Sequence, residues 1–220
     1  PGVYQMEDKQ GNILYIGKAK NLSNRVKNYL SNNSLTKRIQ MMISLTKSMS
    51  FFVTNTELEA IILECNLIKK HKPRYNVLLR DDKSFPYIFI SSEHDFPRIE
   101  KHRGPKKKMG RYYGPFASPD AVNRTINTIQ RIFLLRSCTD REVAAGNKLC
   151  FNYYLKRCSG PCGSRISKKE YSNLIEAADD FLSSGNSDKI QKSFLKKMYR
   201  ASKEKNFELA ASLRDRLKAL

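Results

Sequence analysis

The sequence contains no run of about 18 consecutive apolar residues, the length that a membrane-spanning helix requires. It also has no positively charged segment followed by an apolar one near its start, the pattern of a secretory leader. No internal repeat is visible. We therefore expect a cytoplasmic protein that does not associate with membranes. Because the chain opens at Pro1 without methionine and stops at Leu220 inside a helical pattern, we also expect a fragment.

Acidic residues are scarce: 21 Asp and Glu stand against 41 Lys and Arg, for a net charge of +20. The excess is not confined to one tail, because the segments 1–80, 81–137, 138–167 and 168–220 are all positive. A folded chain this basic usually has a polyanion as its partner, since each neutralised phosphate releases counterions. Charge serving only solubility is the alternative, although a net charge of roughly 2–8 suffices for a small domain.

Four of the five cysteines lie close together in the sequence, at Cys138, Cys150, Cys158 and Cys162. In a chain without a secretory leader, this favours a reducing compartment and metal ligation over disulfides. Four thiolates complete either a structural zinc site or a 4Fe–4S cluster. The spacings of 12, 8 and 4 residues do not choose between these metals, and four free buried thiols remain an alternative. Cys65 lies apart, in an apolar helix, where core packing is expected.

Apolar periodicity predicts an α/β fold for the first 80 residues, with a small mixed sheet flanked by helices. We expect strands at 3–6, 13–16 and 50–53, and helices at about 21–30, 35–43 and 56–72. The first two strands are separated by a polar turn and predict a β-hairpin. Thr56, followed by Glu59 three residues later, is a capping-box pattern.

The remaining chain is divided into four further segments. A second small α/β connecting region at 81–137 is expected to hold strands at 86–90 and 97–100, a basic loop at 104–110 and a helix at 119–135. The cysteine-rich region covers 138–167, and a helix with a Ser/Gly linker at 183–187 covers 168–187. An amphipathic helical hairpin is expected at 188–220.

Glu64 is the most informative acidic residue, because none of its neighbours one helical turn away can neutralise it. These neighbours are Ala60, Ile61, Leu67 and Ile68. A carboxylate among them must find a partner elsewhere or be protonated, because an unpaired buried charge is costly. A functional site and a salt bridge to a distant Lys or Arg explain this equally well. Glu57 and Glu59 lie in the first turn, where capping and the helix dipole account for them.

A second group of polar residues follows the end of the second strand. Gly17, Lys18 and Lys20 precede a helix on which Arg25 and Tyr29 are four residues apart and therefore share a face. A strand end leading through Gly-Lys into a helix could bind phosphate. A solvated basic helix face is an equally good explanation.

Taken together, these residues form a recognisable pattern. Gly2-Val3-Tyr4, ten further residues and Tyr15-Ile16-Gly17 resemble the signature of the GIY-YIG nucleases, with Val3 where isoleucine is usual. Arg25, Tyr29, Glu64 and Asn76 fall where that family has its active-site residues. The wider chain resembles the UvrC family of bacterial nucleotide excision repair nucleases. The similarity runs from Tyr15–Leu22, Glu64–Lys70 and Lys72–Asn76, through Tyr113–Phe116 and the cysteines, to the Phe-Glu-x-Ala-Ala-x-Leu-Arg-Asp run at 207–215.

This resemblance implies a metal-dependent DNA endonuclease. Glu64 would bind Mg²⁺ or Mn²⁺, which are commonly held by one or two carboxylates, and Arg25 would stabilise charge on the scissile phosphate. Tyr15, with Tyr4 and Lys18 nearby, would orient or deprotonate the attacking water. Because an ordinary tyrosine has a pKa near 10, a metal or Lys18 would have to lower it. Tyr29 and Asn76 would position the phosphate and the surrounding network.

The resemblance also implies partners and a place in repair. The enzyme would make the 3′ incision in damaged double-stranded DNA, and it would bind UvrB through the hairpin at 188–220. The family's second nuclease half is absent from this sequence, and its cysteine region suggests an iron–sulfur cluster, with zinc as the alternative. A stand-alone GIY-YIG nuclease is a rival, which the hairpin argues against. A non-catalytic adaptor that binds DNA and UvrB is another, which the presence of Tyr15, Arg25 and Glu64 together argues against.

Overall fold

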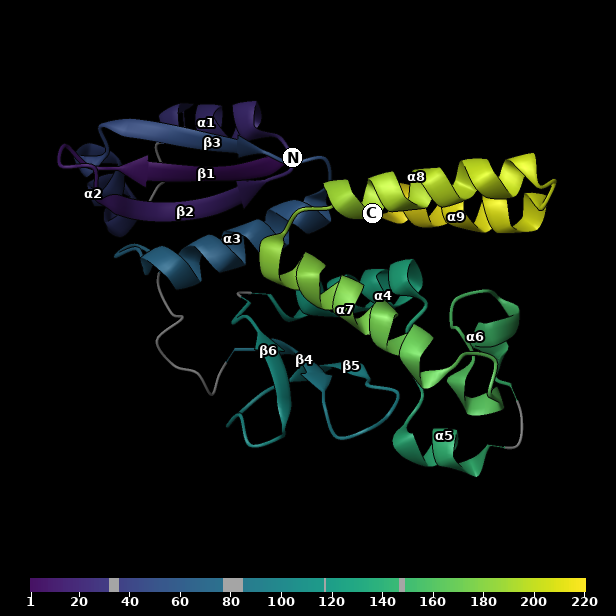
Figure 1. Cartoon of the computed structure of the whole chain (residues 1–220). Helices are drawn as coiled ribbons and strands as arrows, with labels where there is room; N and C mark the ends of the chain where they lie inside the picture. Colours follow the sequence, from purple (N-terminus) through teal and green to yellow (C-terminus); the bar gives the residue numbers. More distant parts are fainter. Residues whose placement is uncertain (32–35, 77–84, 117, 147–148) are drawn as a thin grey trace. The chain divides into compact units, whose positions relative to one another are not determined.

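The computed structural model describes residues 1–31, 36–76, 85–116, 118–146 and 149–220 (Figure 1). The chain divides into two compact units, Pro1–Asp82 and Lys83–Leu220, and each combines an antiparallel sheet with helices. The α/β class predicted from the sequence is therefore confirmed. The domain boundary expected near residue 80 lies outside the described residues. Within the described ranges, no helix is long and apolar enough to cross a membrane.

The first unit is built on a three-stranded sheet in the order β2-β1-β3. Its elements are β1 (Gly2–Glu7), β2 (Ile13–Ala19), α1 (Leu22–Ser31), α2 (Lys37–Leu45), β3 (Ser48–Val53) and α3 (Glu57–His71). Both strand pairs are antiparallel, which corrects the expectation of a mixed sheet. The β1–β2 hairpin reverses the chain at Asp8, whose carboxylate accepts the N–H groups of Gln10 and Asn12. After two helices, β3 returns along the other edge of β1, again antiparallel to it.

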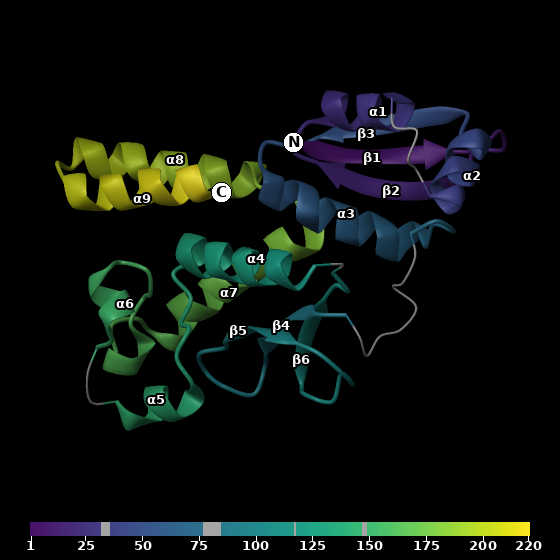
Figure 2. The same cartoon turned by 180° about the vertical axis from the view of Figure 1, so that it is seen from behind.

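Alternation along the strands gives the sheet two buried faces. Val3 and Ile16 pack with Ala60 of α3 on one face, whereas Tyr4 and Met6 belong to the cluster on the other. Side chains from α1 and α2 pack against this second cluster. Within this unit, Figure 1 and Figure 2 show α3 on one side of the sheet and α1 on the other. Helices therefore cover both faces at β1 and β2, whereas β3 is largely exposed, including its Phe51, Phe52 and Val53.

The local sequence of α3 sets where the helix begins and ends. The Thr56 hydroxyl accepts the N–H of Glu59, and the Glu59 carboxylate accepts the N–H of Thr56, so the predicted capping box is confirmed. At the other end, Lys72 is left-handed, with φ of 46°, and its N–H donates to Ile68. Cys65 is buried, consistent with the expected role in core packing.

The second unit contains a smaller sheet covered by helices. β4 (Tyr87–Ser91) is central between β5 (Ile99–His102) and β6 (Gly110–Tyr113), and both pairs are antiparallel. The sequence did not predict β6, because this four-residue strand is exposed or half-buried and shows no apolar alternation. α4 (Pro119–Phe133) packs on the sheet, and the four apolar residues expected on one face of this helix are all buried. These are Val122, Ile126, Ile129 and Phe133.

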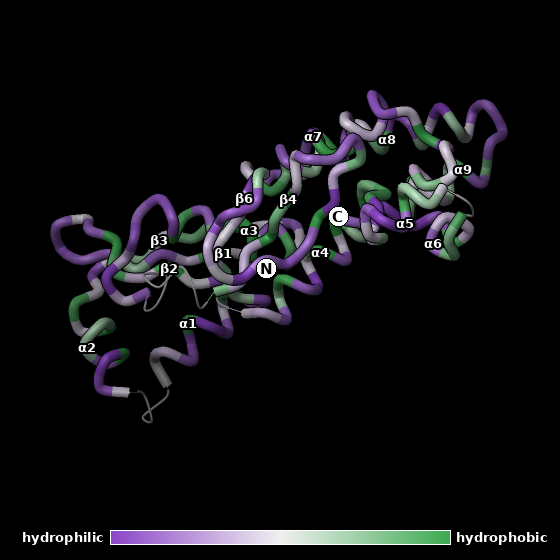
Figure 3. Tube along the Cα trace, turned by 90° about the horizontal axis from the view of Figure 1, so that it is seen from below, coloured by the Kyte–Doolittle hydropathy of each residue, from purple (hydrophilic) through white to green (hydrophobic). Residues whose placement is uncertain are grey.

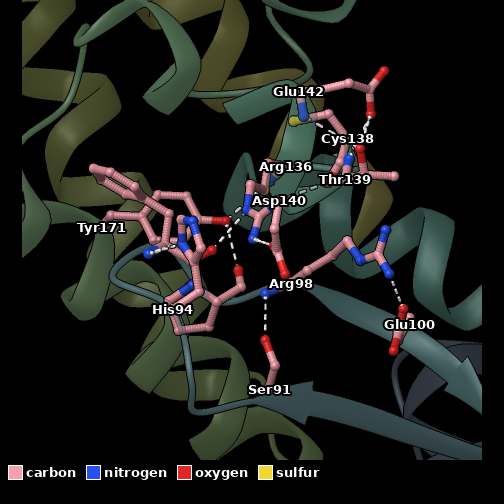
Figure 4. Close-up of polar contacts among 12 residues, drawn as sticks. Ser91, His94, Arg98, Glu100, Arg136, Cys138, Thr139, Asp140, Glu142 and Tyr171 are labelled. Carbon is pink, nitrogen blue, oxygen red and sulfur yellow. Dashed lines mark hydrogen bonds and ion pairs between the residues drawn. The ribbon is translucent and has the colours of Figure 1, made fainter. Parts of the chain in front are cut away.

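A fully buried arginine joins the elements of the second unit (Figure 4). The Arg136 side chain donates from Nε to the carbonyl of Phe96 over 2.6 Å and from a terminal nitrogen to that of Cys138 over 2.8 Å. Its other terminal nitrogen forms an ion pair with Asp140. The backbone N–H of Arg136 donates to the Tyr171 hydroxyl at 3.1 Å. Each polar group named here has a partner, as a buried charge requires.

The cysteine-rich region is made of short helical segments, namely α5 (Asp140–Ala145), α6 (Phe151–Tyr154) and the 3₁₀ turn η1 (Pro161–Gly163). It is followed by α7 (Lys168–Ser184), which extends into the stretch predicted to be a linker. Gly185, with φ of 67°, ends this helix, and Ser187 is fully buried just before the next one. The expected linker is therefore a helix end and a turn, because the left-handed glycine reverses the chain directly.

The final helical pair forms the predicted hairpin, with α8 (Asp188–Lys203) packed against α9 (Phe207–Ala219). The turn between them is hydrophilic (Figure 3). α9 also packs on α4, where Arg216 donates to the carbonyl of Ile132 and lies 4.3 Å from the ring of Phe194. Leu213 is buried, whereas Phe207 is 67% exposed. The hairpin therefore buries one part of its apolar surface on its own chain and leaves another part exposed.

Candidate active site

The two glycines of the Gly-Val-Tyr and Tyr-Ile-Gly motifs are places where the backbone has no room for a side chain. A Cβ on Gly17 would lie 2.5 Å from the Tyr4 hydroxyl and 2.8 Å from the Tyr15 ring. A Cβ on Gly2 would lie 2.4 Å from the carbonyl oxygen of Phe52. Gly17 thus allows Tyr4 to lie against β2. In the sequence, these glycines were noted only as parts of the two motifs. The spacing of the motifs was the signal that could have identified their steric role.

Tyr4, Tyr29 and Arg25 form a hydrogen-bonded group beside the sheet. Tyr4 projects from the central strand and is almost completely buried, and its hydroxyl lies 2.9 Å from that of Tyr29. Arg25 donates from Nε to the Tyr4 hydroxyl at 3.2 Å, and its guanidinium lies 5.1 Å from the centre of the Tyr29 ring. The Arg25 side chain is nevertheless exposed. Tyr4 holds the Nε of Arg25, and the terminal nitrogens of the guanidinium remain accessible to a ligand.

Tyr15 lies next to this group, with its ring 6.0 Å from that of Tyr4. Burial raises the pKa of Tyr15, and the nearby Tyr29 and Glu64 raise it further, while a hydrogen bond with Tyr4 and the charge of Arg25 oppose them. Burial likewise raises the pKa of Tyr4. The protein by itself therefore keeps both phenols protonated, which favours orientation of a water molecule over proton removal by Tyr15.

Glu64 is brought to the same place from α3, which packs against β2 on the other face of the sheet. Its Oε1 accepts the backbone N–H of Lys18 at 2.9 Å, and the carboxyl group is half-buried. Burial raises the pKa of Glu64, and the Lys18 N–H together with the charges of Lys18 and Arg25 opposes this. The carboxylate therefore gains from any further positive charge. The sequence could not decide between a salt bridge and a functional site for Glu64. The structure shows a third kind of partner, the backbone N–H of Lys18.

The side chain of Asn76 is bonded to the backbone of β2. Its Oδ1 accepts the N–H of Ile16 at 2.7 Å, and its Nδ2 donates to the carbonyl of the same residue at 2.6 Å. The adjacent Tyr75 N–H donates to Leu14 at 2.9 Å. The side chain of Asn76 thus pairs with the edge of β2 as another strand would. These bonds hold the strand that carries Tyr15 and Lys18, and the expected role of Asn76 in positioning the phosphate and the surrounding network stays a prediction.

A divalent cation fits the chemistry of the Glu64 carboxylate. One oxygen already accepts an N–H group, but a carboxylate offers about four lone-pair sites. Hydrated Mg²⁺ commonly binds proteins through one or two carboxylates and keeps its remaining waters. Across the described residues, no group of three or more His, Cys, Asp or Glu side chains is arranged to hold a metal. A metal at Glu64 would therefore have most of its ligands from water or substrate.

The four clustered cysteines lie in one region but do not form a metal site in this arrangement. Cys138 precedes α5, Cys150 precedes α6, Cys158 follows it, and Cys162 lies in η1. Burial raises the pKa of Cys158 to about 11, and the other three thiols raise it further, against a hydrogen bond from the Gly160 N–H. In the part of the chain that the structure describes, these thiols are not placed as a metal-binding group, which gives no support to an iron–sulfur cluster. That expectation stays a prediction.

Comparison with known proteins identifies the class and then the family. Three family models match the chain. Residues 1–77 match the model described as "UvrC-like GIY-YIG domain", 85–181 match "UvrC/Cho excinuclease, middle domain", and 188–220 match "UvrB/uvrC motif". The first unit thus contains a UvrC-like GIY-YIG domain. The chain belongs to the UvrC family.

Among its relatives, UvrABC system protein C from Sphingopyxis alaskensis is 52% identical over 220 residues, and that from Zymomonas mobilis is 51% identical over 223. Both matches cover 100% of this chain, but only 34% and 33% of the relatives. The chain thus spans about a third of the length of these proteins.

A solved structure resembles the first unit in sequence. It is the crystal structure of the GIY-YIG N-terminal endonuclease domain of UvrC from Thermotoga maritima, bound to its catalytic divalent cation, magnesium. It is 47% identical, with a TM-score of 0.33, and the match covers 35% of this chain and 83% of that one.

Proposed function

We propose that this chain is a metal-dependent endonuclease that makes the 3′ incision in damaged double-stranded DNA during nucleotide excision repair. The observation that carries the proposal is the convergence of Tyr4, Tyr29 and Arg25 with Tyr15 and Glu64, from two strands and two helices of one unit. An exposed guanidinium, protonated phenols and a carboxylate that gains from added positive charge are the groups that hydrolysis of a phosphodiester needs.

Glu64 would hold Mg²⁺ or Mn²⁺. When bound, such a cation neutralises charge on the phosphate and makes a coordinated water more acidic. Arg25 uses Nε to bind Tyr4, so its terminal nitrogens can donate to the scissile phosphate and stabilise the charge that develops there. Tyr15 would orient the attacking water, and Tyr29 would hold Arg25 and Tyr4 in place.

Lys18 and Asn76 support this arrangement from β2. The Lys18 N–H fixes one oxygen of Glu64, and the Lys18 ammonium adds positive charge beside the carboxylate. Asn76 supports the proposal as a positioning residue, because its two hydrogen bonds to Ile16 set the strand between Tyr15 and Lys18.

We further propose that UvrB is the partner, and that it binds the hairpin formed by α8 and α9. The match of 188–220 to the UvrB/uvrC motif supports this, and so do the exposed apolar side chains of the hairpin. Phe207 is 67% exposed, Tyr199 66% and Leu209 47%. Apolar surface of this kind commonly marks a protein-binding site.

The direct test is incision of a lesion-containing duplex in the presence of UvrB, with and without Mg²⁺. Glu64→Gln should abolish the 3′ incision and leave DNA binding nearly intact, because the amide cannot replace a charged ligand. Glu57→Gln is the matched control on the same helix, where Glu57 pairs with the exposed Lys20 at 3.2 Å. Incision by Glu64→Gln at the wild-type rate would contradict the metal-binding role.

The proposal for the cysteines is a metal centre on Cys138, Cys150, Cys158 and Cys162, either a 4Fe–4S cluster or zinc. Its support is the gathering of four thiols in one region and the N–H of Gly160 donated to Cys158 Sγ at 3.4 Å. Protein purified without oxygen should contain iron and sulfide. Stoichiometric zinc without iron would replace the cluster with a zinc site, and absence of both metals would leave four free thiols.

A further inference from the structure

The second unit contains a polar cleft that none of the assignments above uses. It has a volume of about 670 Å³ and lies along α4, the loop that follows it, α6 and the end of α9. Its polar lining comes mainly from Asn127, Gln130, Arg131, Ser137, Asn152 and Arg157. A smaller cleft of about 360 Å³ adjoins it towards α9 and also has Arg131 and Arg157 in its lining. We call the two together the arginine cleft.

Positive charge in the arginine cleft is not neutralised by neighbouring carboxylates. The larger part has no acidic residue in its lining. In the smaller part, Glu208 pairs with Lys156 at 2.9 Å, and Asp215 pairs with Arg214 at 3.0 Å. Arg131 and Arg157 are both exposed, and neither forms an ion pair with a described residue. Arg131 and Arg157 therefore line the shared part of the cleft without an ion-pair partner among the described residues.

The residues around these arginines favour an extended anion. Asn127 lies four residues before Arg131 and Arg124 seven before it, so all three lie along one face of α4, and all are exposed. Guanidinium and amide groups donate hydrogen bonds, and the planar fork of arginine matches phosphate oxygens. A row of such donors suits successive phosphates of one strand better than a single small anion.

The short helix α6, which contributes to the cleft lining, also carries two exposed aromatic rings. Phe151 is 73% exposed and Tyr154 is 67% exposed, and between them Asn152 lines the cleft. A basic groove with neighbouring aromatic side chains is the combination with which proteins bind single strands, because bases stack on the rings while cations contact the backbone.

We propose that the arginine cleft binds the phosphate backbone of DNA through Arg131 and Arg157. The site lies in the second unit and is separate from the residues proposed for catalysis. It rests on the proposed function only in taking DNA as the polyanion. An acidic protein surface could satisfy the same charges, and the test below separates it from DNA.

The experiment measures binding of labelled single-stranded and duplex DNA by fluorescence anisotropy, over a range of salt and in EDTA, so that no incision is needed. The test variant is Arg131→Gln with Arg157→Gln. The matched control is Arg103→Gln with Arg141→Gln, which removes two exposed arginines elsewhere in the same unit. A third variant, Arg131→Lys with Arg157→Lys, keeps both charges. Thermal midpoints of all variants are recorded.

The cleft variant should bind at least one of the two DNA forms roughly tenfold more weakly at low salt, and its log affinity should depend on log salt with a slope smaller by about 1 to 2. The lysine variant should keep most of the affinity. The DNA form that is weakened identifies the ligand, and loss confined to single strands is the result expected if Phe151 and Tyr154 stack on bases.

Equal weakening in the cleft and control variants would overturn the proposal, because it would show only loss of net charge. Unchanged DNA binding together with loss of UvrB capture would also overturn it and assign the cleft to an acidic protein surface. Because these measurements need neither metal nor incision, a failure of the nuclease proposal at Glu64 would leave their outcome unaffected.

Discussion

The two units of this chain use arginine and tyrosine in opposite ways. In the first unit, Arg25 is exposed and donates to the hydroxyl of Tyr4, which also bonds to Tyr29. In the second, Arg136 has no exposed surface, and its three side-chain nitrogens bind two backbone carbonyls and Asp140. Its tyrosine neighbour Tyr171 accepts the Arg136 N–H and donates to the carbonyl of Pro97 at 3.0 Å.

The difference shows what separates a structural arginine from one available to a ligand. The side-chain nitrogens of Arg136 all bind groups of its own chain, so Arg136 links segments that are distant in the sequence. Arg25 has used Nε, and its terminal nitrogens remain accessible because the side chain is exposed. A fully buried cation stabilises a fold only when each donor is satisfied. An open cation held by a tyrosine is positioned for an external anion instead.

The largest effect on stability is expected at Arg136. Arg136→Met should lower the free energy of unfolding of the second unit by about 3–5 kcal/mol, because two part-buried carbonyls lose their donor and Asp140 loses its ion-pair partner. Urea unfolding measures this. The control is Arg111→Met, which removes an exposed arginine paired with Asp179 and should cost less than about 1 kcal/mol. Similar losses in both variants would show that the buried network adds little.

At Arg25, in contrast to Arg136, substitution should affect incision and leave stability nearly unchanged. Arg25→Ala should reduce the rate of 3′ incision by about a hundredfold or more, since removal of one donor to developing charge commonly has that effect. Its thermal midpoint should change little, because the side chain is exposed. Single-turnover incision and thermal unfolding together test the contrast with Arg136. A large loss of stability with near-normal incision would assign Arg25 to the fold.

Phe207 is an exposed apolar side chain, whereas Arg25 is an exposed cation. Phe207→Ala should weaken binding to UvrB by about 2 kcal/mol and lower incision, because truncating an interface aromatic can have that effect. The thermal midpoint should stay unchanged. Met109→Ala is the control, because it removes an equally exposed large apolar side chain outside the hairpin. If Phe207→Ala instead loses global stability and still binds UvrB in titration calorimetry, the hairpin belongs to this chain's own core.

The smallest effect is expected from the pH dependence of Glu64. Burial raises the pKa of this carboxyl, so the folded state binds its proton more tightly than the unfolded state does. The resulting penalty is absent below the ordinary pKa of glutamate, grows as the pH rises towards the raised value, and is complete above it. Glu64→Gln removes the penalty and should raise the thermal midpoint by no more than a few degrees in that upper range. A difference between the proteins that does not vary with pH would argue against this origin.

Local patterns in the sequence determined much of the fold. The β1–β2 hairpin, the capping box of Thr56 and Glu59, and the buried face of α4 follow from side-chain alternation, capping chemistry and helical periodicity. These are short-range effects, so a single sequence is enough to predict them. The four-residue strand β6 and the turn at Gly185 were missed, because the first has no periodic signal and the second depends on a left-handed glycine.

The arrangement of the site was decided only by tertiary structure. The family resemblance carried by Tyr4, Arg25 and Glu64 implied a nuclease, but periodicity contains no information on contacts between residues far apart in the chain. Glu64 meets the Lys18 N–H across 46 residues, and Asn76 pairs with Ile16 across 60. The first contact holds the carboxylate, and the second holds the strand that carries Tyr15 and Lys18. Which polar groups are already satisfied depends on how strands and helices pack, and that is set by the whole fold.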